Sequence, residues 1–461
     1  MNTLYEIKTH MPDLQIKEIN LLNNKIIVAN IQTISSSEFS NEFVLKYFSK
    51  LSLSHKKIFK SLKYYINNYI PSISYIEIKE DQLLDYLFNG FTILIYKKEF
   101  LAFETKAHLD RGITEPTSEP TVKGPKDSFN ENYNTNIGLI RKRIKDKELF
   151  IDELILGTKT KTRISIIYMN NLVDKELLNN VKDKINNIKT DKILDTYYIK
   201  ELIKKENKSI FPTIKSTEKP DTISKVLTEG KICILSENSN SVLIIPTYFI
   251  DYFYNQEDNY QKSFFIYFVK FIRMLALFIT IFAPSIYLSL ITYDQQMLPT
   301  ELLLNFSNQR ANVPFPALIE AFILMFTFEL LYEADSLTPT SRGTALSVLG
   351  ALILGDAAVS AGIVSPIMVI VVAVTAICSI FFSYHDFQSF IRLYRYTLML
   401  LSSVFGMIGI LFGFLFLITN LCSVKSFGKP FLLPFSPLIK DNKKRLIKKG
   451  LLIQNTNKGE L

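Results

Sequence analysis

The sequence contains no tryptophan, only three cysteines and only four histidines, and these shortages exclude several kinds of protein. The cysteines, at positions 233, 378 and 422, are far apart and lack CxxC spacing, so neither a disulfide framework nor a cysteine zinc site is predicted. The histidines are equally scattered. The N-terminus lacks the basic, apolar and small-residue pattern of a secretory signal. We therefore predict a protein of a reducing compartment with no metal and no cofactor.

The chain is long, with 461 residues and a net charge of +9, and its apolar residues are unevenly placed. Residues 1–262 mix charged and apolar positions as a soluble region does. From Phe264 onward there are five apolar blocks: 264–292, 316–333, 344–363, 366–383 and 396–421. A helix that crosses a bilayer needs roughly 20 apolar residues. The last block carries no charge, which predicts membrane insertion rather than burial in a soluble core.

The stretch from Arg111 to Asp146 has two Glu-Pro steps and a Gly-Pro step. Proline fixes its own backbone and pushes the preceding residue toward an extended form, so the first part is predicted to be a stiff strut. Ser128 and Glu131 have the spacing of a capping box ahead of a helical pattern. A strut that feeds a helix usually joins two folded bodies.

Two segments of the soluble region resemble each other. "DQLLDYLFNGFTILI" begins at Asp81 and "DTISKVLTEGKICIL" at Asp221, and in both a glycine stands nine residues after the aspartate. Each pattern predicts a short helix, a glycine in the left-handed conformation, a buried strand and a hairpin turn. If the likeness is a true repeat rather than chance, the soluble region contains two related units.

The segment between these units, "LFIDELILGTKTKTRISIIYM" at 149–169, has two apolar runs around a Gly-Thr-Lys-Thr turn. It lacks the full Walker spacing, so we interpret it as a plain turn rather than a phosphate loop. Helical patterns follow at 177–188 and from Ile193. This alternation of strands and helices favours a mixed or parallel sheet. A second stiff connector, "FPTIKSTEKPD", precedes the second unit.

The order of these motifs resembles the A subunits of spore germinant receptors, the GerA family. The soluble part of the resemblance rests on Arg111, Gly112, Glu115, Pro116, Glu119, Gly124, Pro125, Asn136, Arg141 and Arg143, and on "TEKPD" at 217–221. It continues in the apolar half with "VPFPALIE" at 313–320 and "LGALILGDAAVSAGIVSP" at 349–366. Residues 1–80 add nothing to it.

The resemblance implies a multi-pass protein of the spore inner membrane that takes part in nutrient sensing. It implies as partners a transporter-like B subunit and a C subunit that is a lipoprotein. The family's A subunits are thought to form homo-oligomers, plausibly pentamers, and to conduct cations when germination begins. The expected fold class is a soluble N-terminal α+β or α/β region of two or more subdomains, followed by an all-α polytopic membrane domain.

The apolar blocks carry acidic residues, which are costly in a bilayer and usually face a cavity or a partner. Four are candidates for an ion pathway: Glu320, Glu329, Glu333 and Asp356. Glu329 and Glu333 share a helix face, whereas Glu320 lies on the opposing side. For Glu329 and Glu333, we slightly favour an interfacial helix or a subunit contact over the lining of a pore. Asp356 is the sharper candidate because its neighbours are small or apolar.

Small residues dominate the third block and permit close helix contacts. The candidates for helix packing are Gly350, Gly355, Ala358, Gly362 and Pro366, the last of which marks a turn or a broken helix. Basic residues flank the first block and fill the tail beyond residue 421, so both ends are predicted to be cytoplasmic. The tail is either a contact for anionic lipid or merely solvated. Because both ends on one side require an even number of crossings, we expect block 316–333 not to cross.

The predicted organisation is an N-terminal α/β subdomain (1–110), a strut (111–127), a second α/β subdomain (128–262), a transmembrane domain (263–423) and a basic cytoplasmic tail (424–461). The leading hypothesis is a nutrient-gated receptor and cation-channel subunit. The alternatives are a non-conducting signalling scaffold or a transporter-like subunit whose partner carries the ligand and the ions. No nucleophile–base pair or nucleotide fingerprint is present in the sequence, so we predict neither an enzyme nor a nucleic-acid binder.

Overall fold

The computed structural model describes residues 2–21, 24–36, 63, 66, 75–106, 124–204, 209–255, 258, 263–337, 355–382 and 384–436. The chain divides into two compact units, which are treated separately below. The sheet unit comprises Met1–Lys208, Thr213–Thr247 and Ser426–Gly428. The helical unit comprises Ser209–Pro212, Tyr248–Lys425 and Lys429–Leu461.

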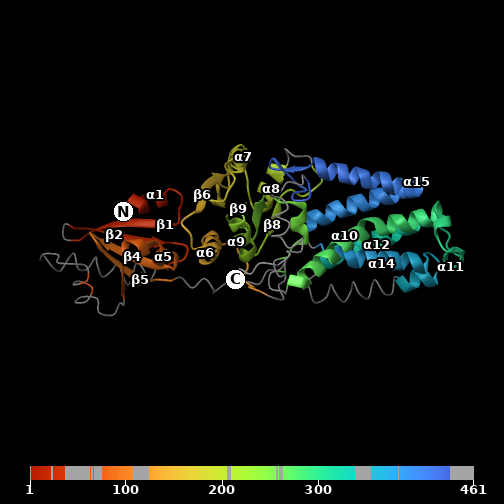
Figure 1. Ribbon diagram of the computed structural model, residues 1–461, viewed down its shortest axis with the longest axis horizontal. Coiled ribbons are helices and arrows are strands. Elements are labelled where there is room, and N and C mark those ends of the chain that lie inside the picture. Colours follow the sequence, from red (N-terminus) through yellow and green to blue (C-terminus); the bar gives the residue numbers. More distant parts are fainter. Residues whose placement is uncertain are drawn as a thin grey trace, which may run out of the picture. The chain divides into compact units, whose positions relative to one another are not determined.

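The first sheet of the sheet unit has the strand order β1-β2-β4-β5-β3 (Figure 1). Its elements are α1 (Asn2–Lys8), β1 (Leu14–Leu21), β2 (Asn24–Ile31), β3 (Tyr75–Ile78), α5 (Leu83–Phe88), β4 (Phe91–Tyr96) and β5 (Glu99–Glu104). Helices α1 and α5 share one apolar cluster with the sheet, to which Leu4, Leu87 and Ile93 contribute. The first 80 residues, which the sequence did not place, thus supply three of the five strands.

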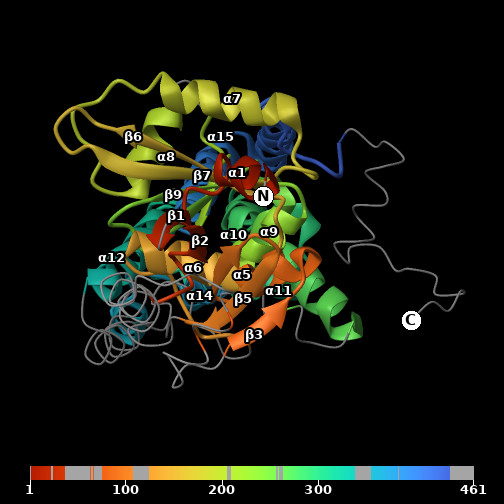
Figure 2. The ribbon, with the colours of Figure 1, turned by 90° about the vertical axis from the view of Figure 1, so that its left-hand side faces the viewer.

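The second sheet has the strand order β6-β7-β9-β10-β8. Its elements are α6 (Tyr133–Arg143), β6 (Leu149–Leu156), β7 (Thr162–Met169), α7 (Lys175–Asn186), α8 (Thr196–Lys204), β8 (Lys215–Thr217), α9 (Pro220–Thr228), β9 (Ile232–Ser236) and β10 (Val242–Ile245). Alternating strand residues point to opposite faces. One face packs against α7 and α8, and the other packs against α6 and α9 (Figure 2).

The two sheets have the same topology, because the fourth and fifth strands lie between the second and the third in both. Every strand pair in both sheets is antiparallel. The expectation of a mixed or parallel sheet is therefore wrong. The α/β alternation misled the prediction because β4, β6 and β9, which each follow a helix, pair with the next strand in an antiparallel hairpin. The connector "FPTIKSTEKPD" also contains a strand, β8, which pairs with β10.

The helix–glycine–strand–hairpin pattern predicted for the two similar segments is confirmed. Gly90 follows α5 and Gly230 follows α9, and both glycines have φ of 82°. The strand after each glycine turns back through Lys97 or through Asn238, which also have positive φ. The plain turn between β6 and β7, at residues 157–161, is confirmed as well.

The helix predicted after the strut exists, but it starts differently. Asn132 is the N-cap of α6, and its side chain accepts the Thr135 N–H at 3.2 Å. The capping box from Ser128 to Glu131 is therefore wrong, since Ser128 instead donates to the carbonyl of Phe129. An asparagine directly before the helix supplies the acceptor that the first turn needs. The strut residues 111–123 lie outside the described residues.

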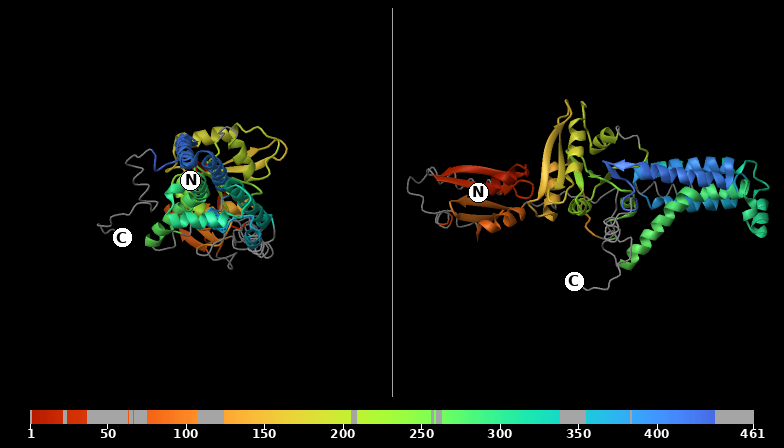
Figure 3. Two further views of the ribbon diagram at one scale, coloured as in Figure 1. Left: turned by 90° about the vertical axis from the view of Figure 1, so that its right-hand side faces the viewer. Right: turned by 45° about the horizontal axis from the view of Figure 1, so that its top comes forward.

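The described part of the helical unit is built mainly from five helices. They are α10 (Ser263–Thr292), α11 (Thr300–Arg310), α12 (Ala317–Leu337), α14 (Pro366–Ile380) and α15 (His385–Ser423). Helix α10 packs along α15 (Figure 3). The predicted break at Ser365 and Pro366 is confirmed as the start of α14, because the Ser365 side chain accepts the Met368 N–H.

Helix α15 is a hairpin rather than one straight helix. Gly406 has φ of 61° and ψ of −142°, and beyond it the chain folds back (Figure 1). The Asn420 side chain consequently donates to the Tyr394 hydroxyl at 3.0 Å. We call residues 385–405 arm 1 and residues 407–423 arm 2. The reading of block 396–421 as a single span is therefore wrong, because its halves belong to two arms.

Contacts within the helical unit define its two ends. The α11 end contains Ser289, Asp294, Ser365 and Gly406, and the opposite end contains Tyr332 and Gln388, whose side chains are hydrogen-bonded at 3.0 Å. Helix α12 runs from the first end to the second beside α14. In the described part of the chain, two helical segments are long and apolar enough to cross a membrane: residues 265–292, and residues 386–423, which are the two arms of α15 joined at Gly406.

Candidate functional site

The acidic residues predicted from the sequence have different environments within the helical unit. Glu329 of α12 lies between two arginines of arm 1. Its Oε1 is 2.6 Å from the Arg395 guanidinium, and its Oε2 is 3.0 Å from Nε of Arg392. The side chain of Arg395 is only 1% exposed. A buried guanidinium needs a compensating charge, so Glu329 is held in an ion-pair network.

Aromatic rings complete this network. The Arg392 guanidinium lies 5.1 Å from the centre of the Tyr332 ring, and that of Arg395 lies 5.4 Å from the Tyr396 ring. The Tyr332 hydroxyl donates to Oε1 of Gln388 at 3.0 Å. These contacts join α12 to arm 1. Within the network, the guanidinium groups of Arg392 and Arg395 both pair with the single carboxylate of Glu329.

Glu320 is completely buried at the α11 end. Its Oε1 accepts the Ser365 backbone N–H at 2.6 Å and the Ser365 hydroxyl at 2.5 Å. Its Oε2 lies 3.8 Å from Nε of Arg310 and has no hydrogen-bond partner in the described part of the chain. One oxygen of this carboxylate therefore binds the N-terminus of α14, and the other faces the end of α11.

Glu333 and Asp356 are exposed on the helical unit. Glu333 lies one turn beyond Glu329 on α12. Asp356 lies in a short helical stretch, residues 355–360, between Gly355 and Ala357. Among the described residues, neither a hydrogen bond nor an ion pair is found for the Asp356 carboxylate.

The small residues proposed for helix packing are partly described. No heavy atom within the described ranges comes within 4 Å of a Cβ built on Gly355. Ala358 and Gly362 are half-buried, and Gly362 has a positive φ of 66° where the helical turn ends. Pro366 is the first residue of α14. Gly350 lies outside the described residues.

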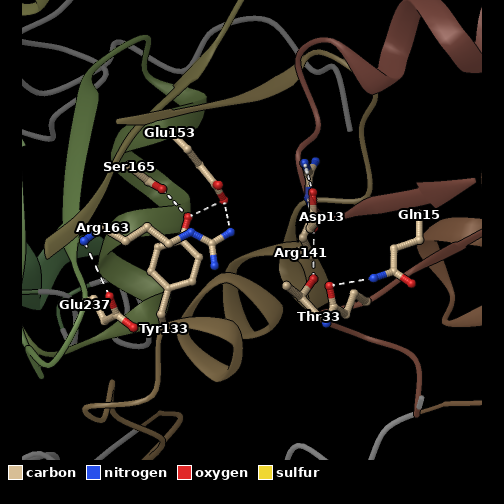
Figure 4. A network of polar contacts seen from close by, with 10 residues as sticks. Asp13, Gln15, Thr33, Tyr133, Arg141, Glu153, Arg163, Ser165 and Glu237 are labelled. Carbon is tan, nitrogen blue, oxygen red and sulfur yellow. Dashed lines mark hydrogen bonds and ion pairs between the residues drawn. The ribbon is translucent and has the colours of Figure 1, made fainter. Parts of the chain in front are cut away.

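In the sheet unit, Arg141 of the family motif lies in the second repeat (α6 to β10) and forms a buried ion pair with Asp13 of the first repeat (α1 to β5). Its guanidinium nitrogen NH2 lies 3.3 Å from Asp13 Oδ1, and NH1 donates to the Leu149 carbonyl at 3.0 Å (Figure 4). The hydroxyl of Thr33 also donates to Asp13, at 2.9 Å. Close by, His10 stacks on Phe150 with the ring centres 4.2 Å apart. Arg141 thus binds the two repeats together.

The other described motif residues fix the chain segment that leads into α6. Arg143 NH2 donates to both carboxylate oxygens of Asp127, at 2.5 and 2.6 Å. The buried side chain of Asn136 donates to the Asn130 carbonyl and accepts the Asn130 N–H. Gly124 precedes Pro125 with φ of 110°. Arg111, Gly112, Glu115, Pro116 and Glu119 lie outside the described residues.

A second polar network lies on the second sheet (Figure 4). The Tyr133 hydroxyl donates to Glu153 at 2.8 Å and contacts the Ser165 hydroxyl, while the Arg163 guanidinium lies 4.1 Å above the Tyr133 ring. Burial raises the pKa of Tyr133 above its ordinary value, so the phenol stays protonated at physiological pH. The partners within this network satisfy one another, which indicates a structural role.

The sequence prediction missed the arginines that face Glu329, as well as Asp13 and Arg310. Two arginines three residues apart, in "FIRLYRYTL" at 390–398, were a usable signal, because arginine is rare beside an apolar span. Within the described ranges, no group of three His, Cys, Asp or Glu side chains could hold a metal ion.

Taken together, a duplicated α+β region and a helical unit with buried charges define a two-part protein with membrane-compatible helices. The sequence profile of the Bacillus/Clostridium GerA spore germination protein family matches residues 2–459. The chain therefore belongs to the GerA family of spore germination proteins. The motif-based recognition of a germinant receptor A subunit is confirmed.

Individual relatives agree with this assignment. The chain is 38% identical to spore germination protein KA of Bacillus subtilis (strain 168) over 339 residues, which is 74% of this chain but only 62% of that protein. It is 32% identical to spore germination protein B1 of the same organism over 413 residues, which is 89% of this chain and 85% of that protein. It is 35% identical to spore germination protein A1, also of that organism, over 71% of this chain and 67% of that protein.

Among solved structures, the chain is similar to the crystal structure of the N-terminal domain of the A subunit of the Bacillus megaterium spore germinant receptor GerK3. The TM-score is 0.42 and the sequence identity is 21%. The likeness covers 54% of this chain and 94% of that domain.

Proposed function

We propose that this chain is a subunit of a nutrient receptor in the spore inner membrane and that copies of it form a ligand-gated cation channel. Membership of the GerA family supports the role in germination. The two long apolar helices support insertion into a bilayer. A transporter-like B subunit and a lipoprotein C subunit are the partners in this proposal, and the ligand is a small nutrient.

The single observation that carries conduction is the environment of Asp356. Its carboxylate is exposed beside Gly355 and Ala357, in a stretch of small and apolar residues. An ionised side chain that faces lipid is costly, so such residues usually line a water-filled space or meet a partner. Several copies arranged around an axis would place these carboxylates in a ring, which is a known device of cation pores.

The other acids suit this role less well. Glu329 is neutralised by Arg392 and Arg395, and Glu320 is bound to Ser365. We therefore propose that Glu329 and Glu320 stabilise the packing of the helical unit. Asp356 is the first candidate for the ion pathway, and Glu333 is the second.

The bend at Gly406 supports a topology in which both chain ends lie on the same side of the membrane. In this topology, block 396–421 contributes to two crossings rather than one. The number of crossings is then even when block 316–333 also crosses, so the parity argument no longer excludes that block. Basic residues near the ends favour the cytoplasmic side for both. A reporter fused to the C-terminus tests this, and a reporter signal from the outside would contradict it.

The test of conduction is cation flux through the complete receptor in liposomes. Asp356→Asn removes the charge but keeps the shape, and Glu301→Gln, on the exposed face of α11, is the matched control. We expect Asp356→Asn to lower the nutrient-triggered flux or alter the selectivity among monovalent cations, with Glu301→Gln unchanged. A receptor that responds to nutrient in spores but passes no cations in liposomes would contradict the channel.

A non-conducting scaffold is the second candidate, and the neutralised Glu329 favours it. An ion-pair network that fixes α12 to arm 1 stabilises a helical unit whether or not ions pass through it. In a scaffold, Asp356→Asn would change only the assembly of the receptor. Flux measured at matched receptor abundance therefore separates the two functions.

A further inference from the structure

The tip of the α15 hairpin is attached to the end of α10 by one acidic side chain. Asp294 Oδ2 accepts the backbone N–H of Met407 at 2.9 Å and the hydroxyl of Ser289 at 2.5 Å. Met407 is the first residue of arm 2, and the first N–H groups of a helix have no acceptor within the helix itself. Asp294, in the turn that follows α10, therefore performs the task of an N-cap for arm 2.

The approach at this point is close enough to require glycine. Gly406 has φ of 61°, and a Cβ on it would lie 2.9 Å from Asp294 Oδ2 and 3.0 Å from Cβ of Tyr293. The backbone N–H groups of Tyr293 and Asp294 both donate to the Ser289 carbonyl at 3.0 Å. The carboxylate thus extends from a fixed turn onto a bend that no larger residue could make without a shift.

The same arrangement occurs a second time at the α11 end. Glu320 of α12 accepts the N–H of Ser365, which is the N-cap of α14. Arm 2 and α14 both start at this end, and each receives an acceptor oxygen from a neighbouring segment rather than only from its own turn. A negative charge at a helix N-terminus also interacts favourably with the helix dipole.

We propose that Asp294 is a positioning residue that fixes the hairpin tip to the end of α10 and thereby sets the position of arm 2 along it. What the position requires is an acceptor oxygen at the Met407 N–H. The structural part of this inference is independent of the proposed function, and only an effect on cation release would rest on that function.

Hydrogen exchange of the full-length protein in detergent tests this inference. In Asp294→Ala the Met407 amide loses its acceptor, and exchange in a peptide covering 405–410 should accelerate about fivefold, as expected for the loss of a capping interaction of ordinary strength. In Asp294→Asn the carboxamide oxygen can still accept, so exchange should stay within about twofold of the parent. This rescue by the conservative variant separates positioning from mere loss of stability.

Glu320→Ala is the matched control. It should accelerate exchange at residues 365–368 and leave 405–410 unchanged, while Asp294→Ala should do the opposite. If Asp294→Ala does not accumulate as folded protein, Ser289→Ala removes one of the two hydrogen bonds to the same carboxylate, and faster exchange at 405–410 is again expected.

Two results would overturn the inference. Unchanged exchange at 405–410 in Asp294→Ala, or in Ser289→Ala where that variant replaces it, would show that the contact fixes nothing. Equally fast exchange in Asp294→Asn and Asp294→Ala would show that charge, not the acceptor oxygen, matters. Failure of the parent receptor to pass cations would contradict the proposed function while leaving the exchange result intact, so the two failures are distinguishable.

Discussion

Arg141 and Asp13, 128 residues apart in the sequence, form an ion pair in which the arginine side chain is fully buried and the aspartate is 6% exposed. Arg141 belongs to the helix that opens the second repeat, and Asp13 directly precedes the first strand of the first repeat. Desolvation makes the formation of such a pair costly, but once it is formed, the loss of one partner leaves an uncompensated buried charge. The pair therefore links the stability of one repeat to that of the other.

We expect Arg141→Ala to destabilise the sheet unit by about 3–5 kcal/mol, because Asp13 would remain buried and charged without its partner. The apolar double variant Arg141→Met with Asp13→Leu should recover much of that loss. Chemical denaturation of the full-length protein in detergent, followed as a double-mutant cycle, measures the coupling. Additive effects of the two single substitutions would contradict a direct interaction.

The sequence predicted those parts of the fold that depend on neighbouring residues. Each helix–glycine–strand unit was recognisable because the left-handed glycine and the apolar strand lie within fifteen residues of each other. The antiparallel order of the sheets was not, because it depends on pairing between segments such as β2 and β4 that lie far apart in the chain. The first 31 residues likewise gave no family signal, although they form two strands.

The same reasoning applies to the candidate site. A carboxylate within an apolar block was visible as a charge in an unfavourable place, but its partner was not. Glu329 meets Arg395 across 66 residues, and only the packing of two helices brings them together. The bend at Gly406 was hidden because an uncharged run has the same composition whether it crosses a bilayer once or folds back on itself.

Gly90 and Gly230 should tolerate alanine poorly, and for the same two reasons. Each has φ of 82°, and a Cβ would lie 2.8 Å from the Ile34 carbonyl oxygen or 2.6 Å from that of Leu172. Left-handed backbone alone costs a non-glycine residue roughly 1–2 kcal/mol. Gly428→Ala is the control, since Gly428 has φ of 85° with no described atom within 4 Å of a Cβ. In thermal unfolding, both repeat variants should lose more stability than the control, and equal losses would exclude the steric contribution.

Asp221, in the first turn of α9, predicts a pH-dependent effect. Burial raises the pKa of its carboxyl above the ordinary value of 3.8, so the ionised form is less stable in the folded protein than in the unfolded chain. The contribution of Asp221 to the free energy of unfolding is fully present below its ordinary pKa. That contribution is lost as the pH rises through the higher pKa of the folded state, because the carboxyl must then ionise where it is buried. Asp221→Asn should therefore raise the unfolding midpoint at pH 7 and leave it unchanged near pH 3. A gain of equal size at both pH values would contradict the electrostatic cause.

The cysteines should differ in reactivity toward maleimide. Burial raises the pKa of the Cys233 thiol, which has no exposed surface in β9, whereas Cys422 is exposed near the end of arm 2. Since the thiolate is the reactive form, at pH 8 in detergent we expect labelling of Cys422 and none of Cys233 until denaturant is added. Peptide mass spectrometry identifies the labelled residue, and Cys422→Ser is the control that should abolish the fast phase. Fast labelling of Cys233 in the native protein would show that β9 is accessible.

Gly409 and Gly413 lie where the two arms of α15 approach each other closely, so alanine substitutions there test how tightly the arms pack. A Cβ on Gly409 would lie 2.3 Å from the Leu401 carbonyl oxygen, while one on Gly413 would mainly meet the end of the Leu398 side chain. A backbone oxygen cannot move aside as a leucine methyl can, so Gly409→Ala must push the arms apart, whereas Gly413→Ala requires only a rotamer change. We expect Gly409→Ala to cost on the order of 1–3 kcal/mol and Gly413→Ala clearly less. Tyr394→Trp, next to Asn420, provides a fluorescence probe of arm separation in a chain without other tryptophans. A larger change of its emission in Gly413→Ala than in Gly409→Ala would contradict the hairpin geometry.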